Sequence, residues 1–201
     1  MKLSTTRTKT GRVNVFADGE YRFTVPFSLW CAAGLDGAEA DEEALSDLRA
    51  RGERADAYEK AVSLLARRDH GEQELYRKLR RLYSGEASAA AIARCRENGL
   101  TDDARFAAAY AEELFRKRGF SPERITEALL QRGIDRETAK NAVRGLDIDR
   151  KSAIIDIIKK MHLPEALTQK ELDRVLRRLT AAGYSMREIR AVLRFTEETE
   201  E

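Results

Sequence analysis

The sequence predicts an all-α protein made of tandem three-helix repeats in an elongated, curved array, preceded by a small N-terminal β-hairpin. Three observations predict this fold. Past Glu39, the apolar residues keep the spacing of amphipathic helices to the end of the 201-residue chain. Regular stop signals divide this stretch into about nine short helices, which group into triplets with a period of about 47 residues. A three-helix unit is too small to bury its own apolar face, so neighbouring units are expected to stack.

Two β-rich runs near the N-terminus predict the hairpin. Residues 12–16 and 21–25 are rich in β-branched and aromatic side chains, and Asp18-Gly19 between them suits a tight turn with positive φ angles. Two strands alone are only marginally stable. We therefore expect the hairpin to pack on residues 27–35 or on the first helix of the body.

Five short segments predict where helices end and the next ones begin. In each, a glycine is followed by an apolar residue and then by a polar residue that can cap a helix. The glycine is expected to take the left-handed conformation, the apolar side chain to fold back onto the last turn, and the polar residue to start the next helix. The five segments are Gly99-Leu100-Thr101, Gly119-Phe120-Ser121, Gly133-Ile134-Asp135, Gly145-Leu146-Asp147 and Gly183-Tyr184-Ser185.

Prolines and capping boxes add further boundary signals. A proline fits the first position of a helix and otherwise interrupts one. A Ser or Thr followed three residues later by Glu can form a reciprocal cap. These signals occur at Pro122 after Ser121, at Pro164, at Thr168 with Glu171, and at Ser185 with Glu188.

The boundaries divide the chain into four parts. Helices that open near Arg54, Asp102 and Asp149 lead the three repeats. The second helix of each repeat carries a similar run of leucine or isoleucine, over residues 74–82, 125–130 and 172–179. The expected parts are residues 1–50 (hairpin and acidic connecting segment), 51–100 (repeat 1), 101–147 (repeat 2) and 148–201 (repeat 3 with an acidic tail).

The formal net charge is only +2, but the charges are segregated along the chain. Residues 1–34 carry +3, residues 35–56 carry −5 and the glutamates after Thr196 carry −4, which leaves +8 on residues 57–196. A basic helical region suits a polyanionic partner, although a well-solvated surface would have the same composition. The acidic segment 36–56 could be a linker, a helix packed on the first repeat, or a brake that occupies the basic surface when no partner is present.

The residues that could carry catalysis do not converge in the sequence. His70 and His162 each lie at a helix boundary, where capping or exposure to solvent is expected, and Cys31 and Cys95 form neither a CxxC pair nor a group with histidine. No glycine loop is of the kind that cradles phosphate, and no run approaches the roughly 20 apolar residues of a membrane span. We therefore expect no enzyme activity, no catalytic residue, no cofactor and no metal, reduced cysteines, and a cytoplasmic location.

Basic residues recur at similar points of the three repeats. They end the first helix of a repeat or lie on or near the second helix. Cations at a helix C-terminus interact favourably with the helix dipole, which explains many of these residues but not those in mid-helix. If the repeats stack in register, the side chains form a line that could follow phosphates or an acidic protein groove. These candidate partner-binding and DNA-binding residues, called the basic ridge below, are Arg67, Arg68, Arg77, Lys78, Arg80, Arg81, Arg116, Lys117, Arg118, Arg132, Arg177 and Arg178.

One predicted helix carries an aromatic stripe. Phe106, Tyr110 and Leu114 are spaced four residues apart, with Ala107 and Ala111 beside them. Packing against a neighbouring helix is the expected role, and stacking on nucleic-acid bases is the alternative.

Several segments, taken together, resemble a known family from Gly11 onward. In order and spacing they are similar to the RecX regulatory proteins, bacterial modulators of the RecA recombinase. The resemblance covers nearly the whole chain, with one departure: Gly71 stands where a polar capping residue usually precedes Glu74. The segments are residues 11–20 (GRVNVFADGE), residues 67–75 (RRDHGEQEL) with Lys78-Leu79, and the series Asn98-Gly99-Leu100-Thr101-Asp102-Asp103, Phe106-Ala107, Tyr110, Gly119-Phe120, Ile125, Leu129 and Gly133-Ile134.

The resemblance implies a RecA regulator that acts in DNA repair, recombination and the SOS response. The repeats would lodge in the helical groove of a RecA filament on single-stranded DNA and inhibit its ATPase, strand-exchange and co-protease activities. A monomer that meets single-stranded DNA directly or through the filament is expected. Two alternatives stay open: a direct DNA-binding protein of tandem helix-turn-helix-like units, whose binding would be salt-sensitive, and a scaffold that uses its apolar inner face.

Overall fold

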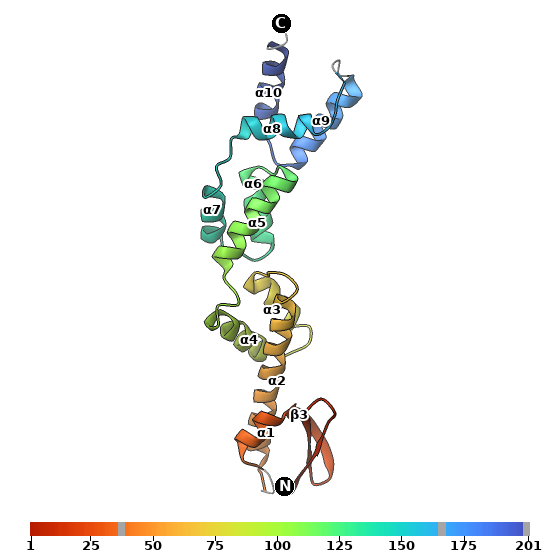
Figure 1. Ribbon diagram of the computed structural model, residues 1–201, viewed down its shortest axis with the longest axis vertical. Coiled ribbons are helices and arrows are strands. Elements are labelled where there is room, and N and C mark those ends of the chain that lie inside the picture. The colour runs from red at the N-terminus through yellow and green to blue at the C-terminus, as the bar shows by residue number, and fades with distance from the viewer. Residues whose placement is uncertain (36–38, 165–167, 199–201) are drawn as a thin grey trace. The chain divides into compact units, whose positions relative to one another are not determined.

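The computed structural model describes residues 1–35, 39–164 and 168–198, with side chains described as far as residue 193. The chain forms two compact units, Met1–Asp102 and Asp103–Glu201. Helices dominate both units, and the one sheet of the described residues lies in the first (Figure 1). The prediction of a mainly helical chain with a small N-terminal β element is confirmed.

The N-terminal β element is a three-stranded antiparallel sheet. Its strands, in spatial order, are β1 (Leu3–Arg7), β2 (Arg12–Ala17) and β3 (Glu20–Pro26). The predicted hairpin is confirmed as β2 and β3, and its turn has φ angles of 49° at Asp18 and 85° at Gly19. The prediction of only two strands is wrong, because β1 pairs with β2 along its whole length. As an edge strand, β1 buries only Leu3 and so lacks an alternating apolar pattern.

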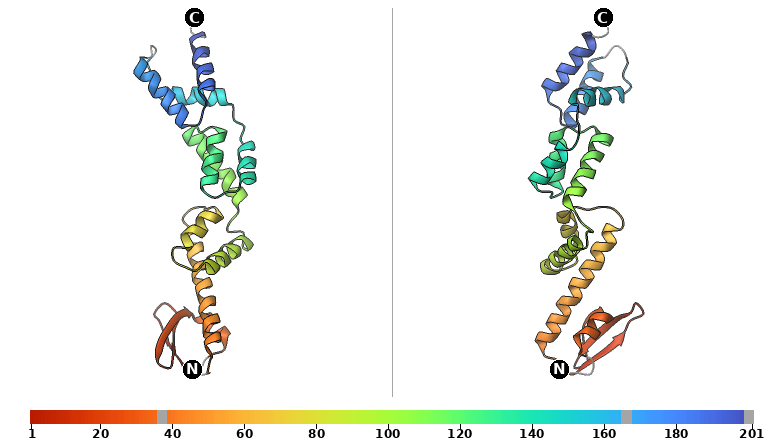
Figure 2. Two further views of the ribbon diagram at one scale, coloured as in Figure 1. Left: turned by 180° about the vertical axis from the view of Figure 1, so that it is seen from behind. Right: turned by 60° about the vertical axis from the view of Figure 1, so that its left-hand side comes forward.

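The sheet packs on α1 (Phe27–Ala33) and on the N-terminal half of α2 (Glu42–Leu65). Gly52 lies where α2 meets β3, and a Cβ atom at this position would lie 2.5 Å from Val25 Cγ1. The expected support of the hairpin is therefore confirmed, and Figure 2 shows the sheet beside the lower half of α2. The shared core contains Leu3, Val13, Val15, Ala17, Val25, Trp30, Ala40, Leu45 and Leu48.

The first helix of the first repeat starts earlier than predicted. Asp41 caps it by accepting a hydrogen bond from the Ala44 N–H at 2.8 Å, and α2 then runs unbroken across residue 50 to Leu65. The expected start near Arg54 is wrong, and the acidic segment is not a linker, because from residue 42 onward it is the N-terminal half of α2. Residues 36–38 lie outside the described residues. Few apolar residues mark this half of the helix, since acidic side chains cover its outer face.

Three modules of three helices make up the rest of the described chain. Each has its own apolar core. Module 1 is α2, α3 (Glu72–Leu79) and α4 (Gly85–Glu97); module 2 is α5 (Asp103–Arg118), α6 (Pro122–Gln131) and α7 (Arg136–Arg144); module 3 is α8 (Arg150–Lys159), α9 (Gln169–Ala181) and α10 (Met186–Glu198).

The core positions of the three modules recur every 50 residues, not every 47. The shorter period rests on helix starts near Arg54, Asp102 and Asp149, and the first of these is wrong. The buried positions, by contrast, are equivalent in the three modules. In the first helices, the buried residues with this spacing are Ala57, Ala107 and Ile157. In the second helices, they are the pairs Leu75 and Leu79, Ile125 and Leu129, and Val175 and Leu179, all with no exposed surface.

Four of the five predicted left-handed glycines are confirmed, with φ of 66° at Gly99, 67° at Gly119, 89° at Gly133 and 95° at Gly183. The prediction is wrong for Gly145, which has a φ of −70°. Its N–H bonds to the Asn141 carbonyl at 3.1 Å, so the last turn of α7 closes in the right-handed conformation and needs no left-handed residue.

The predicted helix starts at Ser121, Asp135, Thr168 and Ser185 are also confirmed. The prediction is wrong for Asp147, because Asp149 caps α8. Pro122 occupies the first turn of α6 after the Ser121 cap. Thr168 and Glu171 form a reciprocal capping box at the start of α9. The side chain of Ser185 accepts from the Glu188 N–H at 3.3 Å, while Glu188 accepts from the Ser185 N–H at 2.8 Å.

Candidate partner-binding surface

The basic ridge is divided equally between the two units. Ten of its twelve residues are exposed, and Lys78 and Arg132 are half-buried. Its alignment as one continuous line stays a prediction. In unit 1, Arg67 and Arg68 follow α2, Arg77 and Lys78 lie on α3, and Arg80 and Arg81 follow it; in unit 2, Arg116, Lys117 and Arg118 end α5, Arg132 ends α6, and Arg177 and Arg178 lie on α9.

In module 1, the carboxylate of Glu74 forms ion pairs with two residues of the basic ridge. Arg68 contacts it from the end of α2 at 2.5 Å, and Lys78 Nζ lies 3.8 Å away on the next turn of α3. The Glu74 side chain is only 19% exposed, so these contacts are partly shielded from water. Two ridge residues are thus held in place by one carboxylate.

The same carboxylate lies beside a buried histidine. His70 is only 4% exposed, so the expectation of a capping or solvent-exposed role is wrong. Its Nδ1 atom lies 3.1 Å from Glu74 Oε1, without the geometry of a hydrogen bond. Burial lowers the pKa of His70, the charge of Arg68 lowers it further, and Glu74 only partly opposes them. His70 is therefore a neutral core residue near pH 7.

The ridge residues at the end of α5 are held loosely. Arg116 pairs with Glu112 at 3.2 Å, and Lys117 pairs with Glu113 at 2.9 Å, each one helical turn apart. All four side chains are at least half exposed, and exposed pairs of this kind contribute little to stability. Hydrogen bonding to Lys117 lowers the pKa of Glu113, so the carboxylate stays charged. These cations can exchange their intramolecular partners for those of another molecule.

Arg132 covers the aromatic stripe of module 2. Its guanidinium lies 4.3 Å from the centroid of the Tyr110 ring, which in turn stacks on Phe106 at 5.8 Å with an interplanar angle of 14°. Phe106 is buried and Tyr110 is half-buried. The packing role expected for the stripe is confirmed, and Arg132 takes part in that packing through a cation–π contact.

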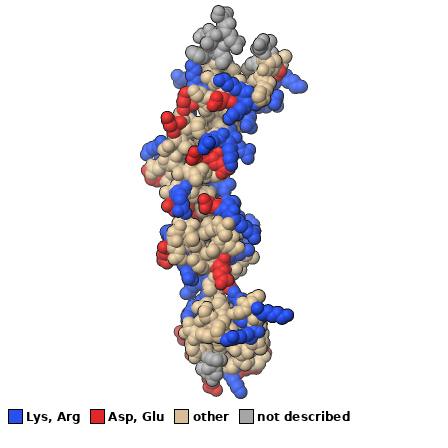
Figure 3. Space-filling view, viewed as in Figure 1, with Lys and Arg blue, Asp and Glu red and all other residues tan. Residues whose placement is uncertain are grey.

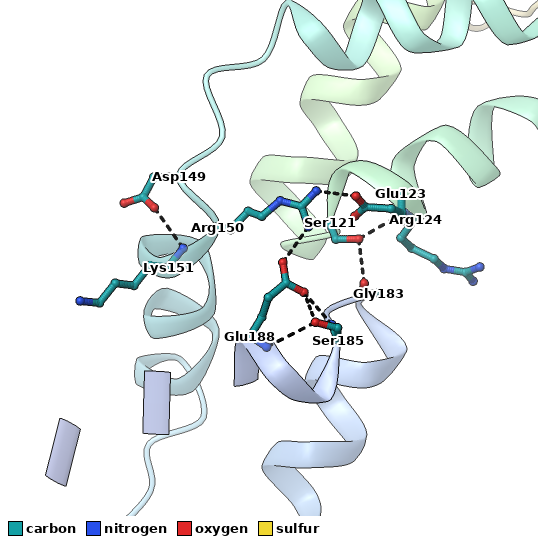
Figure 4. Close-up of polar contacts among 9 residues, drawn as sticks. All are labelled: Ser121, Glu123, Arg124, Asp149, Arg150, Lys151, Gly183, Ser185 and Glu188. Atoms are coloured by element: carbon teal, nitrogen blue, oxygen red, sulfur yellow. Dashed lines mark hydrogen bonds and ion pairs between the residues drawn. The ribbon is translucent and has the colours of Figure 1, made fainter. Parts of the chain in front are cut away.

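Modules 2 and 3 are joined by hydrogen bonds between the start of α6 and the α9–α10 turn (Figure 4). The Ser121 N–H donates to the Ala182 carbonyl at 2.9 Å, and the Ser121 hydroxyl donates to the Gly183 carbonyl at 3.0 Å. Ser121 is fully buried. A Cβ atom on Gly183 would lie 2.5 Å from Ser121 Oγ, so the close approach requires glycine. We call this contact the module joint.

Arg150 adds an ion-pair network to the module joint. Its guanidinium pairs with Glu188 at 2.7 Å and with Glu123, so it links the starts of α6, α8 and α10 (Figure 4). The hydrogen bonds to Glu123 and Glu188 raise the pKa of Arg150. Burial opposes ionisation of Glu123, but the hydrogen bond from Arg150 lowers its pKa overall. Tyr184 is buried in the same joint, where burial raises its pKa to about 12.

A basic pocket of about 500 Å³ opens between modules 2 and 3. The end of α5, the end of α8 with its following turn, and α9 form its walls. On the face seen in Figure 3, Lys and Arg side chains gather around the crossing of α8 and α9. The residues that line the pocket are Lys117, Arg118, Gly119, Ile157, Lys160, Met161, His162, Arg174 and Arg178.

The pocket brings together three residues of the basic ridge and adds cations that the ridge omits. Lys117, Arg118 and Arg178 are ridge residues that converge here. Lys160 and Arg174 are not, and their position depends on how α9 packs against α8. Lys160 is marked in the sequence by its place in the basic pair Lys159-Lys160 at the end of a helix, but no signal in the sequence marks Arg174. Ridge residues of module 1 do not line this pocket.

The described residues contain neither a metal-ion site nor a membrane-spanning helix. Across residues 1–35, 39–164 and 168–198, no group of three or more His, Cys, Asp or Glu side chains is arranged to hold a metal ion. No helix within these same ranges is long and apolar enough to cross a membrane. Cys31 is exposed and Cys95 is buried, and both are free thiols.

Tandem three-helix modules with exposed arginine and lysine side chains define a helical-repeat protein with a basic surface. Comparison with known proteins gives the particular family. The model for the first three-helix domain of RecX matches residues 57–95, and the model for its second three-helix domain matches residues 102–143. These ranges fall on modules 1 and 2.

Curated relatives extend the match along the chain. The chain is 37% identical over 150 residues to Regulatory protein RecX of Escherichia coli (strain K12). The aligned region covers 68% of this chain and 89% of that protein. Regulatory protein RecX of Shigella sonnei (strain Ss046) is 37% identical over 148 residues, covering 67% and 87%. The chain belongs to the RecX family of regulatory proteins, and the resemblance seen in the sequence is confirmed.

Two solved structures share the fold. A crystal structure of regulatory protein RecX superposes with a TM-score of 0.67 at 22% identity, covering 95% of this chain and 98% of that one. The crystal structure of RecX from Lactobacillus salivarius gives a TM-score of 0.58 at 18% identity, with coverage of 72% and 97%. Both support the three-helix modules described above.

Proposed function

We propose that this protein regulates the RecA recombinase by binding its filament on single-stranded DNA, and that it inhibits ATP hydrolysis, strand exchange and co-protease activity. Membership of a family of regulatory proteins, at 37% identity over 150 residues, is the observation that carries the proposal. The protein acts in the cytoplasm as a monomer, by binding rather than by catalysis, in DNA repair and the SOS response.

The loosely held cations of the basic ridge support the binding step. Arg116 and Lys117 give up only exposed pairs within α5 when they meet a carboxylate or a phosphate. The side chain of Arg118, next to them, has no hydrogen bond or ion pair with any residue that the structure describes. The end of α5 can therefore contact an anionic surface without breaking the fold.

The module joint supports the inhibitory step. Because Ser121 and Arg150 tie modules 2 and 3 together, the two modules contact a partner as one block. If modules 2 and 3 bind neighbouring RecA subunits more tightly in one arrangement of those subunits than in another, they disfavour the second arrangement. The size of the effect is the difference between the two binding free energies. We infer that this difference opposes the subunit shifts that accompany ATP turnover.

The test is a titration of the cognate recombinase on single-stranded DNA while ATP hydrolysis is measured. The unmodified protein is expected to lower hydrolysis near stoichiometric ratios. A variant with Arg116→Glu, Lys117→Glu and Arg118→Glu should need at least about tenfold more protein, because each reversal replaces an attraction with a repulsion. Unchanged hydrolysis in excess unmodified protein would contradict the proposed function.

A matched control separates the ridge from net charge. The variant with Arg136→Glu, Lys140→Glu and Arg144→Glu makes the same charge change on exposed positions of α7, outside the ridge. It is expected to inhibit as the unmodified protein does. Equal inhibition by the two triple variants would remove the ridge from the mechanism.

Direct DNA binding is a second candidate, favoured by the basic pocket between modules 2 and 3. It predicts binding to DNA without any recombinase, with an affinity that falls steeply as salt rises. Fluorescence anisotropy of a labelled oligonucleotide over a salt series measures this slope. A flat salt dependence, or no binding at low salt, counts against this function.

A further inference from the structure

The basic pocket between α5, α8 and α9 has the composition of an anion site. Five of its lining residues are cationic, no lining residue is a carboxylate, and Ile157 and Met161 supply an apolar wall. Its volume of about 500 Å³ is within the range of pockets that bind small molecules. Such a pocket suits a ligand that combines several negative charges with some apolar surface.

The cations are not fully explained by the fold itself. Lys117 and Arg118 end α5, and Lys160 caps α8, where positive charge complements the helix dipole. Arg174 lies in the middle of α9, and Arg178 follows it one turn later on the same face. Like charges at this spacing destabilise a helix. A ligand that binds both side chains would offset that repulsion.

The side chains are available to a ligand. Lys160, Arg174 and Arg178 are exposed, and none of their side chains forms a hydrogen bond or ion pair with any residue of the described ranges. Of the nearby carboxylates, Glu113 is held by Lys117, while Glu171 is held in the capping box with Thr168. Lys117 is thus paired with Glu113, whereas the side chains of Lys160, Arg174 and Arg178 keep a charge that no lining carboxylate neutralises.

The pocket is also preformed. Its wall at Gly119 is fixed by close packing, because a Cβ atom there would lie 2.9 Å from Ile157 Cδ1. The module joint holds the same two modules together through Ser121 and Gly183. Binding therefore needs little rearrangement of the backbone, which lowers the entropic cost of holding a ligand.

We propose that this pocket binds linked phosphate groups, two or three on one molecule, between modules 2 and 3. Separate cations on three helices match phosphates that are spaced along a chain better than they match a single compact anion. The phosphates come either from a free nucleotide or from consecutive positions of a nucleic-acid backbone. This proposal does not rest on the regulation of RecA, because it concerns a ligand of the isolated chain.

The experiment measures binding by isothermal titration calorimetry at low salt, with the full chain and no recombinase. Inorganic tripolyphosphate is expected to bind at one site per chain, and orthophosphate at equal ionic strength at least about tenfold more weakly. The double variant Arg174→Gln and Arg178→Gln should raise the dissociation constant for tripolyphosphate by about tenfold or more, because two charge-assisted contacts are lost. The matched control, Arg136→Gln with Lys140→Gln on α7, should leave it unchanged.

Competition then identifies the source of the phosphates. If ATP displaces tripolyphosphate but a single-stranded oligothymidylate does not, the ligand is a free nucleotide; displacement by the oligonucleotide assigns the pocket to a nucleic-acid backbone. The proposal is overturned if neither tripolyphosphate nor the oligonucleotide binds, if orthophosphate binds as tightly, or if the α9 double variant binds like the control. Circular dichroism and thermal melting of each variant check that a loss of binding is not a loss of fold.

Discussion

Replacing Gly183 by alanine is expected to destabilise the second unit by about 2–5 kcal/mol. Two effects add at this position. A φ of 95° is unfavourable for any residue with a Cβ atom, and that atom would lie 2.5 Å from Ser121 Oγ and 2.7 Å from Arg124 Cβ. Since Ser121 is buried in the module joint, the joint must open or shift. Urea denaturation followed by circular dichroism measures the change in the free energy of unfolding.

Gly99→Ala is the matched control for this variant. Gly99 ends α4 as Gly183 ends α9, with a φ of 66°, but nothing lies within 4 Å of the position of its Cβ atom. It should lose only the conformational part, about 1–2 kcal/mol. If the two variants lose the same free energy of unfolding, the close contact across the module joint does not contribute to stability.

Replacing Gly52 by valine is expected to lower the stability of the first unit by about 3 kcal/mol. The added side chain would collide with Val25, whose Cγ1 atom lies 2.5 Å from the Cβ position and which is only 1% exposed. Because Val25 is β-branched and packed in the sheet, it cannot turn away. Thermal melting, and hydrogen exchange of the β2 and β3 amides, should both report a loosened sheet.

The same change at Gly85 tests whether the effect comes from the contact or from helix propensity. Gly85 begins α4, and the nearest atoms to its Cβ position are 3.7 Å away at the ends of the Tyr76 and Arg80 side chains. Gly85→Val should leave stability unchanged or raise it by a few tenths of a kcal/mol. A loss at Gly85 as large as that at Gly52 would refute the packing explanation.

The sequence predicted those parts of the fold that depend on local signals. Gly183 and Ser185 mark the turn between α9 and α10 by conformation and capping, and both effects act within a few residues. Asp18 and Gly19 mark the hairpin for the same reason. The strand β1 and the true start of α2 were missed, because each is stabilised by packing on a distant segment rather than by its own pattern.

The candidate site was predicted less completely than the fold. Charge and helix position identified Lys117, Arg118 and Arg178 without showing that they meet in one pocket. Arg174 was missed because it meets the ends of α5 and α8 only once modules 2 and 3 pack together. The periodicity of the sequence predicts the helices of each module but not the packing between modules. The sequence predicts a capping or solvent-exposed role for His70, but its side chain is buried in module 1 beside Glu74.

Because α2 is one unbroken helix, it fixes the rotation of the sheet relative to module 1. Leu45 and Leu48 pack on the sheet side, whereas Ala57 and Ala61 pack on α3 and α4. Each residue of an α-helix turns the chain by about 100° and advances it by 1.5 Å. One residue inserted between these two stretches would swing the sheet about a quarter of a turn around module 1, so the length of this stretch sets the angle at which the sheet is presented.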